Sequence, residues 1–138
     1  MDVEIRDGIE HMDFEKITNM LSKAVWSQGI KINEVKQGAV NSSLAVGAFC
    51  DGIQVGFARV ISDKTRFAYI ADVYVDEKYR HNGIAKRIME HILSCGLFKD
   101  VYQWYLISAA HELYEKVGFV KLSEPEKWME IRHNRPDR

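Results

Sequence analysis

The sequence predicts an α/β (α+β) fold in which helices cover the faces of a mixed sheet. Two apolar stretches flank Asp51-Gly52, a combination that is typical of a tight hairpin. The next stretch, Phe67–Val75, is apolar except at Asp72, which indicates a strand covered on both faces. Helical spacing then begins at Gly83–Cys95. Helices inserted between strands, together with the hairpin, favour a mixed sheet.

The first third of the chain is predicted to hold one strand and two helices. Met1–Arg6 alternates weakly between polar and apolar residues, as a strand does. Asp13 is a typical N-cap, and apolar residues recur at helical spacing after it as far as Val25. Segment 26–43 is less regular, and a short helix is expected around residues 31–37.

The middle of the chain is predicted to be a run of three strands. Leu44–Cys50 and Ile53–Ile61 form the hairpin, and the polar turn Asp63–Arg66 leads into strand 67–75. Residues 76–82 form a charged loop.

The last third is predicted to alternate helices with strands. Ile84, Ile88 and Ile92 stand four residues apart on one helical face, and Gly96 follows where a C-cap glycine belongs. The remaining predicted elements are strand 101–107, helix 109–117 ended by Gly118, and strands 119–122 and 128–131.

Length and composition are those of one folded domain. The chain has 138 residues, of which 46% are hydrophobic, enough for a core without disulfides or a structural metal. This composition excludes a disordered or fibrous chain. We expect a single domain over residues 1–131 and a loose tail over residues 132–138.

Charge and cysteine content exclude several classes of partner. Nineteen Lys and Arg against twenty Asp and Glu leave a net charge of −1. The overall charge of the chain therefore does not attract nucleic acid or an anionic membrane. No apolar run approaches the roughly 18 residues of a spanning helix, and the opening MDVEIRDG shows no signal-peptide pattern. Cys50 and Cys95 stand far apart, which predicts reduced cysteines and no metal site. We therefore expect a cytoplasmic protein.

The stretch Ala71–Ala85, ADVYVDEKYRHNGIA, is the most informative for function. A buried strand ends there, a short loop follows, and a helix begins at Gly83. The first N–H groups of a helix have no intrahelical partner and lie at the positive end of its dipole, so they suit an anion such as a diphosphate. On spacing alone, Gly83 fits a tight strand-to-helix turn equally well. Nearby groups that add positive charge or hydrogen-bond donors are Arg80, His81 and Lys86.

Two motifs in this half of the chain resemble those of the GNAT family of N-acetyltransferases. Arg80–Ala85, RHNGIA, matches the family pattern of Gln or Arg, two residues, Gly, one residue, and Gly or Ala. Val73–Val75 looks like the family's strand just before that motif. Leu113–Phe119, LYEKVGF, is similar to a second family signature, at an agreeing distance. The upstream elements also fit, so the resemblance covers nearly the whole chain and is typical of a small bacterial branch.

The resemblance implies a mostly antiparallel sheet of six to seven strands with about four helices on its faces. Strands 67–75 and 101–107 would run parallel and splay apart, with acetyl-CoA between them. Its pantetheine would pair with the backbone of Val73 and Val75, and its diphosphate would lie on the amides of residues 81–85. The residues implied to bind acetyl-CoA, and CoA as product, are Val73, Tyr74, Val75, Arg80, His81, Asn82, Gly83, Ile84, Ala85, Lys86, Ser108 and Tyr114.

The resemblance also implies two catalytic groups. Tyr114 would protonate the leaving CoA thiolate, since a phenol with the ordinary pKa of about 10 is protonated at pH 7. The backbone amide of Val73 would stabilise the oxyanion. The structural alternative for Tyr114 is a ring packed on the sheet. Ile107 stands where many members have an Asn that helps to hold the cofactor, and Ser108 partly substitutes for it.

The general base stays open. Family members often place Glu or His in strand 67–75, at positions where this chain has Tyr69 and Ala71. Asp72 is a further catalytic candidate, but alternation points it to the opposite face from those two residues. A structural carboxylate that accepts backbone hydrogen bonds is therefore the favoured interpretation of Asp72. His111 and a chain of water molecules are also candidates for the base, although a solvated surface residue is the favoured interpretation of His111.

The function that the resemblance implies is transfer of an acetyl group from acetyl-CoA to a primary amine, by direct attack in a ternary complex. Two different functions are compatible with the same fold, a non-catalytic acyl-CoA sensor and a partner-binding module. The acceptor would contact segment 26–43, which mixes Lys31, Lys36 and Glu34 and so shows no acidic groove. Family analogy also suggests a homodimer.

Overall fold

The computed structural model describes residues 1–138 and contains one five-stranded sheet in the order β1-β2-β3-β4-β5. Short 3-10 turns occupy Ile9–His11, Val25–Ser27, Glu77–Tyr79, Gly96–Phe98 and Pro125–Lys127. No helix is both long and apolar enough to cross a membrane. The strands are β1 (Val3–Asp7), β2 (Leu44–Cys50), β3 (Ile53–Ser62), β4 (Phe67–Val75) and β5 (Gln103–Tyr105), and the helices are α1 (Phe14–Ser22), α2 (Ile32–Val40), α3 (Ile84–Ser94) and α4 (His111–Glu115).

The pairing of the strands confirms the mixed sheet and its one parallel pair. β1 to β4 pair antiparallel in sequence, whereas β4 and β5 run parallel. The parallel pairing covers only three residues of each strand and ends at Tyr69 and Tyr105. β4 continues to Val75 without β5 beside it, so the two strands separate toward the carboxyl end of β4.

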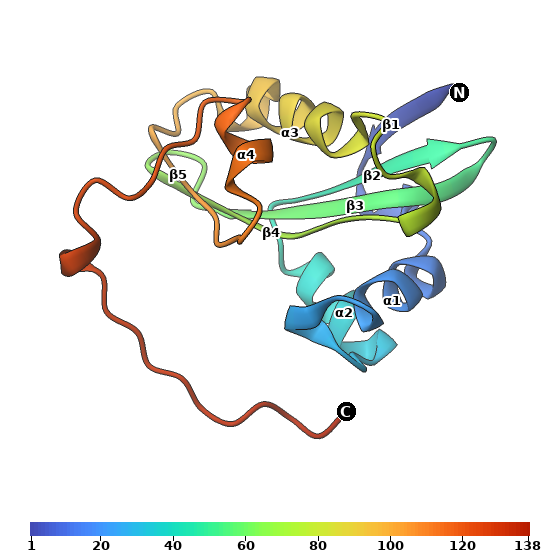
Figure 1. The fold of residues 1–138 in the computed structure, drawn as a ribbon, viewed down its shortest axis with the longest axis horizontal. Coiled ribbons are helices and arrows are strands. Elements are labelled where there is room, and N and C mark those ends of the chain that lie inside the picture. The colour runs from blue at the N-terminus through green and yellow to red at the C-terminus, as the bar shows by residue number, and fades with distance from the viewer.

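Helices cover both faces of the sheet, as expected (Figure 1). α3 and α4 lie on one face, where Ile88, Met89 and Ile92 are fully buried against the strands. α1 and α2 lie on the other face, around Ile17 and Phe57. Four helices and two separate apolar clusters thus enclose the middle strands, which explains the near-continuous apolar sequence of β2, β3 and β4.

The two strands expected at 119–122 and 128–131 are not formed. After Gly118, at φ 105°, the chain leaves the sheet and runs outside it as the long red segment in Figure 1. Met129 is 96% exposed, and Trp128, which is 50% exposed, packs its ring against Tyr105 of β5 at 4.7 Å between ring centroids. Alternating apolar residues favour a strand, but only a partner with free backbone groups makes one, and this segment has none.

Helix ends also differ from the sequence prediction. Asp13 does cap α1, accepting a hydrogen bond from the Lys16 N–H at 3.1 Å. Gly96, however, is not a left-handed C-cap: α3 ends at Cys95 in an extended conformation, and Gly96 begins a 3-10 turn. The position of a glycine in the sequence does not distinguish one that ends a helix from one that begins the next turn.

A buried glutamine that the sequence patterns did not indicate fixes the start of α1. Gln54 in β3 is 1% exposed, and its Oε1 accepts a hydrogen bond from the Asp13 N–H at 2.9 Å. Its Nε2 donates to the Gly56 carbonyl at 3.0 Å. Because both ends of the amide are satisfied, burial is compatible with stability, and the N-cap of α1 is held on the sheet.

An ion pair ties α1 to the loop that precedes α3, and its contribution should depend on pH. Lys16 Nζ lies 2.6 Å from Asp76 Oδ2, and this hydrogen bond holds the pKa of Asp76 below its usual value. A lowered carboxyl pKa stabilises the fold above the unfolded pKa, and this stability is lost as the pH falls through the folded one. We expect Lys16→Gln to lower the free energy of unfolding by up to about 1 kcal/mol at pH 7 and by less at pH 3.

Urea denaturation at the two pH values measures both differences. Lys127→Gln is the control, because Lys127 and its partner Glu124 are both mostly exposed and should contribute almost nothing. An equal loss for Lys16→Gln at pH 7 and pH 3 would contradict the assignment to the Asp76 carboxylate.

Candidate functional site

A bulge in β4 shapes the centre of the site. Arg59 pairs with Ala71 and Phe57 pairs with Tyr74, so Asp72 and Val73 together stand opposite Ala58 alone. Asp72 adopts φ 58°, a left-handed conformation that is rare for a residue with a side chain. The extra residue interrupts the alternation of side chains. Asp72 therefore lies on the α2 face of the sheet together with Arg59. Because Arg59 is the cross-strand partner of Ala71, their side chains share a face. The prediction that Asp72 points to the opposite face from Tyr69 and Ala71 is therefore wrong.

The carboxylate of Asp72 is held by two side chains. Arg59 Nε donates to Asp72 Oδ2 at 2.8 Å, and Trp26 Nε1 donates to Asp72 Oδ1 at 3.2 Å. The expected backbone donors are thus replaced by side chains. Arg59 was missed by the sequence patterns, although a lone arginine inside an otherwise apolar strand was a usable signal. With both oxygens engaged, the geometry favours a structural role for Asp72.

The start of α3 presents a row of free backbone donors. No backbone carbonyl accepts a hydrogen bond from the N–H groups of residues 81–86, and the first helical bond runs from Arg87 N–H to the Gly83 carbonyl at 3.1 Å. His81 at φ 66° and Gly83 at φ 73° both adopt the left-handed conformation, which turns this backbone into a concave loop. A Cβ on Gly83 would meet nothing within 4 Å, so the loop is open on that side.

Two of the predicted binding side chains shape this loop. Arg80 Nε donates to the Val75 carbonyl at 3.0 Å, and its guanidinium lies 5.0 Å from the centre of the Tyr74 ring. Asn82 Nδ2 donates to the carbonyls of Tyr79 and Arg80 at 3.0 and 3.1 Å. These contacts join the end of β4 to the loop and leave the backbone donors for a ligand.

The other residues of the loop divide between solvent and core. His81 and Lys86 are exposed beside the donors. Ile84 is 2% exposed and anchors α3 in the core, so only its backbone faces the loop's concave side. Ala85 packs partly buried against the same apolar cluster.

Tyr114 lies on the α3 and α4 face of the sheet. Its side chain is buried in the same apolar cluster that Val73 packs against, and its ring meets Phe119 edge-on at 6.2 Å. Burial raises the pKa of Tyr114, and the neighbouring Ser108 hydroxyl partly opposes that shift. The phenol is therefore protonated at neutral pH. Tyr114 and Ser108, which the sequence predicts for one site, are together, whereas Ile107 is largely exposed.

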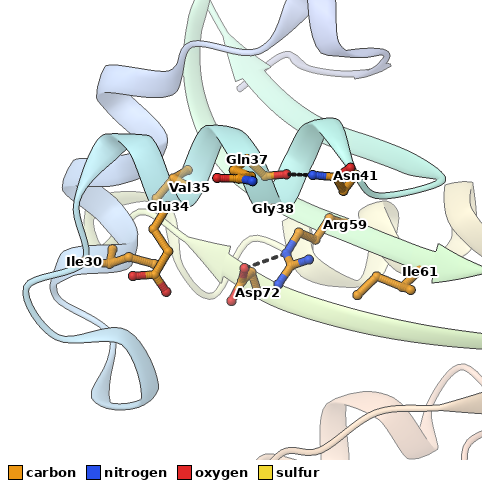
Figure 2. A pocket seen from close by; sticks show the side chains of 9 residues that line it. All are labelled: Ile30, Glu34, Val35, Gln37, Gly38, Asn41, Arg59, Ile61 and Asp72. Atoms are coloured by element: carbon orange, nitrogen blue, oxygen red, sulfur yellow. Dashed lines mark hydrogen bonds and ion pairs between the residues drawn. The ribbon is translucent and has the colours of Figure 1, made fainter. Parts of the chain in front are cut away.

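A pocket of about 400 Å³ opens on the opposite face, between α2 and the middle of β3 and β4 (Figure 2). Asp72 at the bulge forms part of its wall, so the pocket adjoins the residue before Val73. Its lining combines the Arg59–Asp72 ion pair with apolar side chains and polar groups of α2. The lining residues are Ile30, Glu34, Val35, Gln37, Gly38, Asn41, Arg59, Ile61 and Asp72.

The structure shows no candidate metal-binding cluster and no disulfide. The structure holds no group of three or more His, Cys, Asp or Glu side chains that could bind a metal ion. Cys50 is buried and Cys95 partly buried, and both are free.

Comparisons with known proteins agree on the domain type. Residues 41–121, more than half of the chain, match the model of the acetyltransferase (GNAT) domain. A crystal structure of a GNAT-family protein from Xanthomonas campestris pv. campestris superposes with a TM-score of 0.87 at 33% identity, over 96% of this chain and 94% of that one. A GNAT-family acetyltransferase from Streptococcus pneumoniae TIGR4 gives a TM-score of 0.77 at 25% identity, over 98% and 100%.

A third structure shares the fold and was solved with a ligand. It is an acetyltransferase from Clostridium acetobutylicum with acetyl-CoA, at a TM-score of 0.71 and 16% identity over 95% of this chain and 96% of that one. Among curated proteins, no sequence matches.

Proposed function

This chain belongs to the GNAT family of acetyltransferases, and from that premise we propose that it transfers an acetyl group from acetyl-CoA to a primary amine by direct attack in a ternary complex. The observation that carries the proposal is the row of free N–H groups at residues 81–86, beside the bulged end of β4. The likeness to the Clostridium acetobutylicum protein solved with acetyl-CoA supports the same ligand.

The residues present fit acetyl-CoA. The N–H groups of residues 81–86, together with the α3 dipole, suit its diphosphate. The part of β4 beyond Tyr69 has no partner on the β5 side, which leaves a strand edge for the amide groups of the pantetheine. The Val75 carbonyl on this stretch already accepts one hydrogen bond from Arg80.

In the proposed reaction, the amine nitrogen attacks the thioester carbon and the carbon–sulfur bond breaks to release CoA. The Val73 N–H, displaced from regular pairing by the bulge, stabilises the oxyanion. Tyr114, whose raised pKa keeps the buried phenol protonated, donates its proton to the departing thiolate. The acceptor ammonium loses one proton to water before attack, and the proton that its nitrogen releases on forming the amide returns through water to Tyr114. No side-chain base is assigned, because Tyr69 and Ala71 offer neither a carboxylate nor an imidazole.

The acceptor amine binds, in this proposal, in the pocket lined by α2 and β3. That pocket adjoins the bulge on the face opposite Tyr114, so an amine there and a thioester beside β4 would approach the same peptide unit from two sides. Binding both substrates at once accounts for direct transfer without a covalent intermediate.

A thiol-release assay with acetyl-CoA and a panel of primary amines tests the proposal. We expect CoA release that depends on the amine, and an acetylated amine of the corresponding mass. Binding of acetyl-CoA without CoA release in the presence of any amine would favour the non-catalytic acyl-CoA sensor. The absence of a carboxylate or imidazole at Tyr69 and Ala71 is the reason for considering that function. Absence of acetyl-CoA binding would favour the partner-binding module.

A further inference from the structure

The residues that line the acceptor-side pocket include one carboxylate that no other lining residue neutralises. Three charged residues line it, and two of them, Arg59 and Asp72, neutralise each other at 2.8 Å. Glu34 is the charge that remains. Lys31 and Lys36 of the same segment are exposed and do not line the pocket. Of the charged side chains of residues 31–36, only Glu34 lines the pocket, and its side chain keeps 44% of its surface exposed.

The chain itself shows that a cation fits against this carboxylate. Arg138 reaches back across the surface, and its Nη2 lies 2.5 Å from Glu34 Oε2 while its Nε lies 3.3 Å from Oε1. The Arg138 side chain is only 14% exposed, and its Nη1 is buried without a hydrogen-bond partner. Arg138 also packs close to Gly29, where a Cβ would lie 3.5 Å from the Arg138 Cβ, an ordinary van der Waals distance. The Arg138 guanidinium thus donates two hydrogen bonds to a carboxylate that lines the pocket, and most of the Arg138 side chain is shielded from solvent.

The rest of the pocket suits a methylene chain. Ile30, Val35 and Ile61 supply its apolar lining; Ile30 and Val35 lie near Glu34, whereas Ile61 lies beyond Arg59 and Asp72 (Figure 2). An acceptor with its reacting amine at the bulge and a second positive group at Glu34 would run its alkyl spacer past Ile30 and Val35.

We propose that Glu34 is a cation subsite that selects acceptors with a guanidinium or ammonium group in addition to the amine that is acetylated. The proposal rests on the acetyl-transfer function proposed above and specifies its acceptor class. In the free enzyme Arg138 occupies the subsite and competes with the acceptor. The shared chemistry fits two sources, a small diamine-like molecule and a peptide with a basic residue near its amino end.

Matched pairs of acceptors test the subsite. Agmatine carries a primary amine and a guanidinium, and n-pentylamine carries the amine alone; Gly-Arg amide and Gly-norleucine amide form the equivalent peptide pair. We expect kcat/KM to be at least tenfold higher for the cationic member of one pair, and the pair with the larger ratio identifies the source. Glu34→Gln should remove that preference by raising KM, with the neutral acceptors unaffected.

Two further variants separate the subsite from general effects. Glu90→Gln removes an exposed carboxylate on α3, on the other face of the sheet, and should leave the preference intact. Arg138→Ala should raise kcat/KM for the cationic acceptors several-fold and leave that for n-pentylamine unchanged. An equal response of both acceptors to Arg138→Ala would overturn the competition.

Calorimetry with agmatine and with Gly-Arg amide, each in the presence of CoA, needs no turnover and so distinguishes failure of the subsite from failure of the enzyme. Binding that Glu34→Gln weakens about tenfold would support the subsite even if no amine released CoA. Equal kcat/KM for the cationic and the neutral member of both pairs would overturn the subsite and leave the acetyl-transfer function intact. Binding of equal strength in the wild type and in Glu34→Gln for both cationic acceptors, or no binding of either, would also overturn it.

Discussion

Gly83→Val should abolish measurable CoA binding while leaving the protein folded. Gly83 adopts φ 73°, where a β-branched residue is strongly disfavoured, so the variant should lose about 1–2 kcal/mol of stability. Its side chain would also project into the open space beside the donors of residues 81–86. Isothermal titration with CoA should show at least a hundredfold loss of affinity, because both the loop conformation and the access to its N–H groups change.

Gly52→Val is the matched control for backbone strain. Gly52 has φ 78° and open space around its Cβ position, but it lies in the hairpin turn between β2 and β3. We expect a similar loss of stability with unchanged CoA affinity. If both variants lost CoA affinity equally, the anion-binding role of the α3 start would be wrong.

Tyr114→Phe should lower kcat at least tenfold without changing the affinity for acetyl-CoA. The substitution keeps the ring in its buried position against Phe119 and removes only the phenolic proton donor. The expected decrease in kcat is near the lower end of the range for loss of a general acid, because an alkyl thiolate is already a fair leaving group. Steady-state thiol release measures kcat, and thermal unfolding with acetyl-CoA measures cofactor binding.

The same chemical change elsewhere provides the comparison. Tyr102 is 66% exposed and lies outside the proposed site, so Tyr102→Phe should keep kcat unchanged. An unaltered kcat in Tyr114→Phe would remove Tyr114 from the mechanism and leave the Val73 amide and substrate positioning as the catalytic devices.

The local sequence was sufficient to predict those elements whose structure depends on neighbouring residues. The hairpin around Asp51-Gly52, the Asp13 cap and β4 at Phe67–Val75 all follow from turn residues, side-chain acceptors and apolar runs, and the structure confirms them. The helix expected to begin at Gly83 is also present, with Gly83 as the N-cap of α3.

Long-range geometry decided the features that sequence did not reveal. The bulge at Asp72 depends on the register of β3 against β4, and one extra residue there reverses the face that alternation predicts. The absent strands after Gly118 depend on a pairing partner, which periodicity does not supply. The contact between Glu34 and Arg138 joins residues 104 positions apart, so it can be identified only in the folded structure.

Hydrogen–deuterium exchange with and without acetyl-CoA tests the central claim most directly. The account places the diphosphate on the N–H groups of residues 81–86, which have no backbone acceptor in the protein and should exchange quickly without ligand. Acetyl-CoA should slow exchange in peptides covering residues 81–86 and the end of β4, and ATP at the same concentration should not. Unchanged exchange at residues 81–86 under saturating acetyl-CoA would contradict the account.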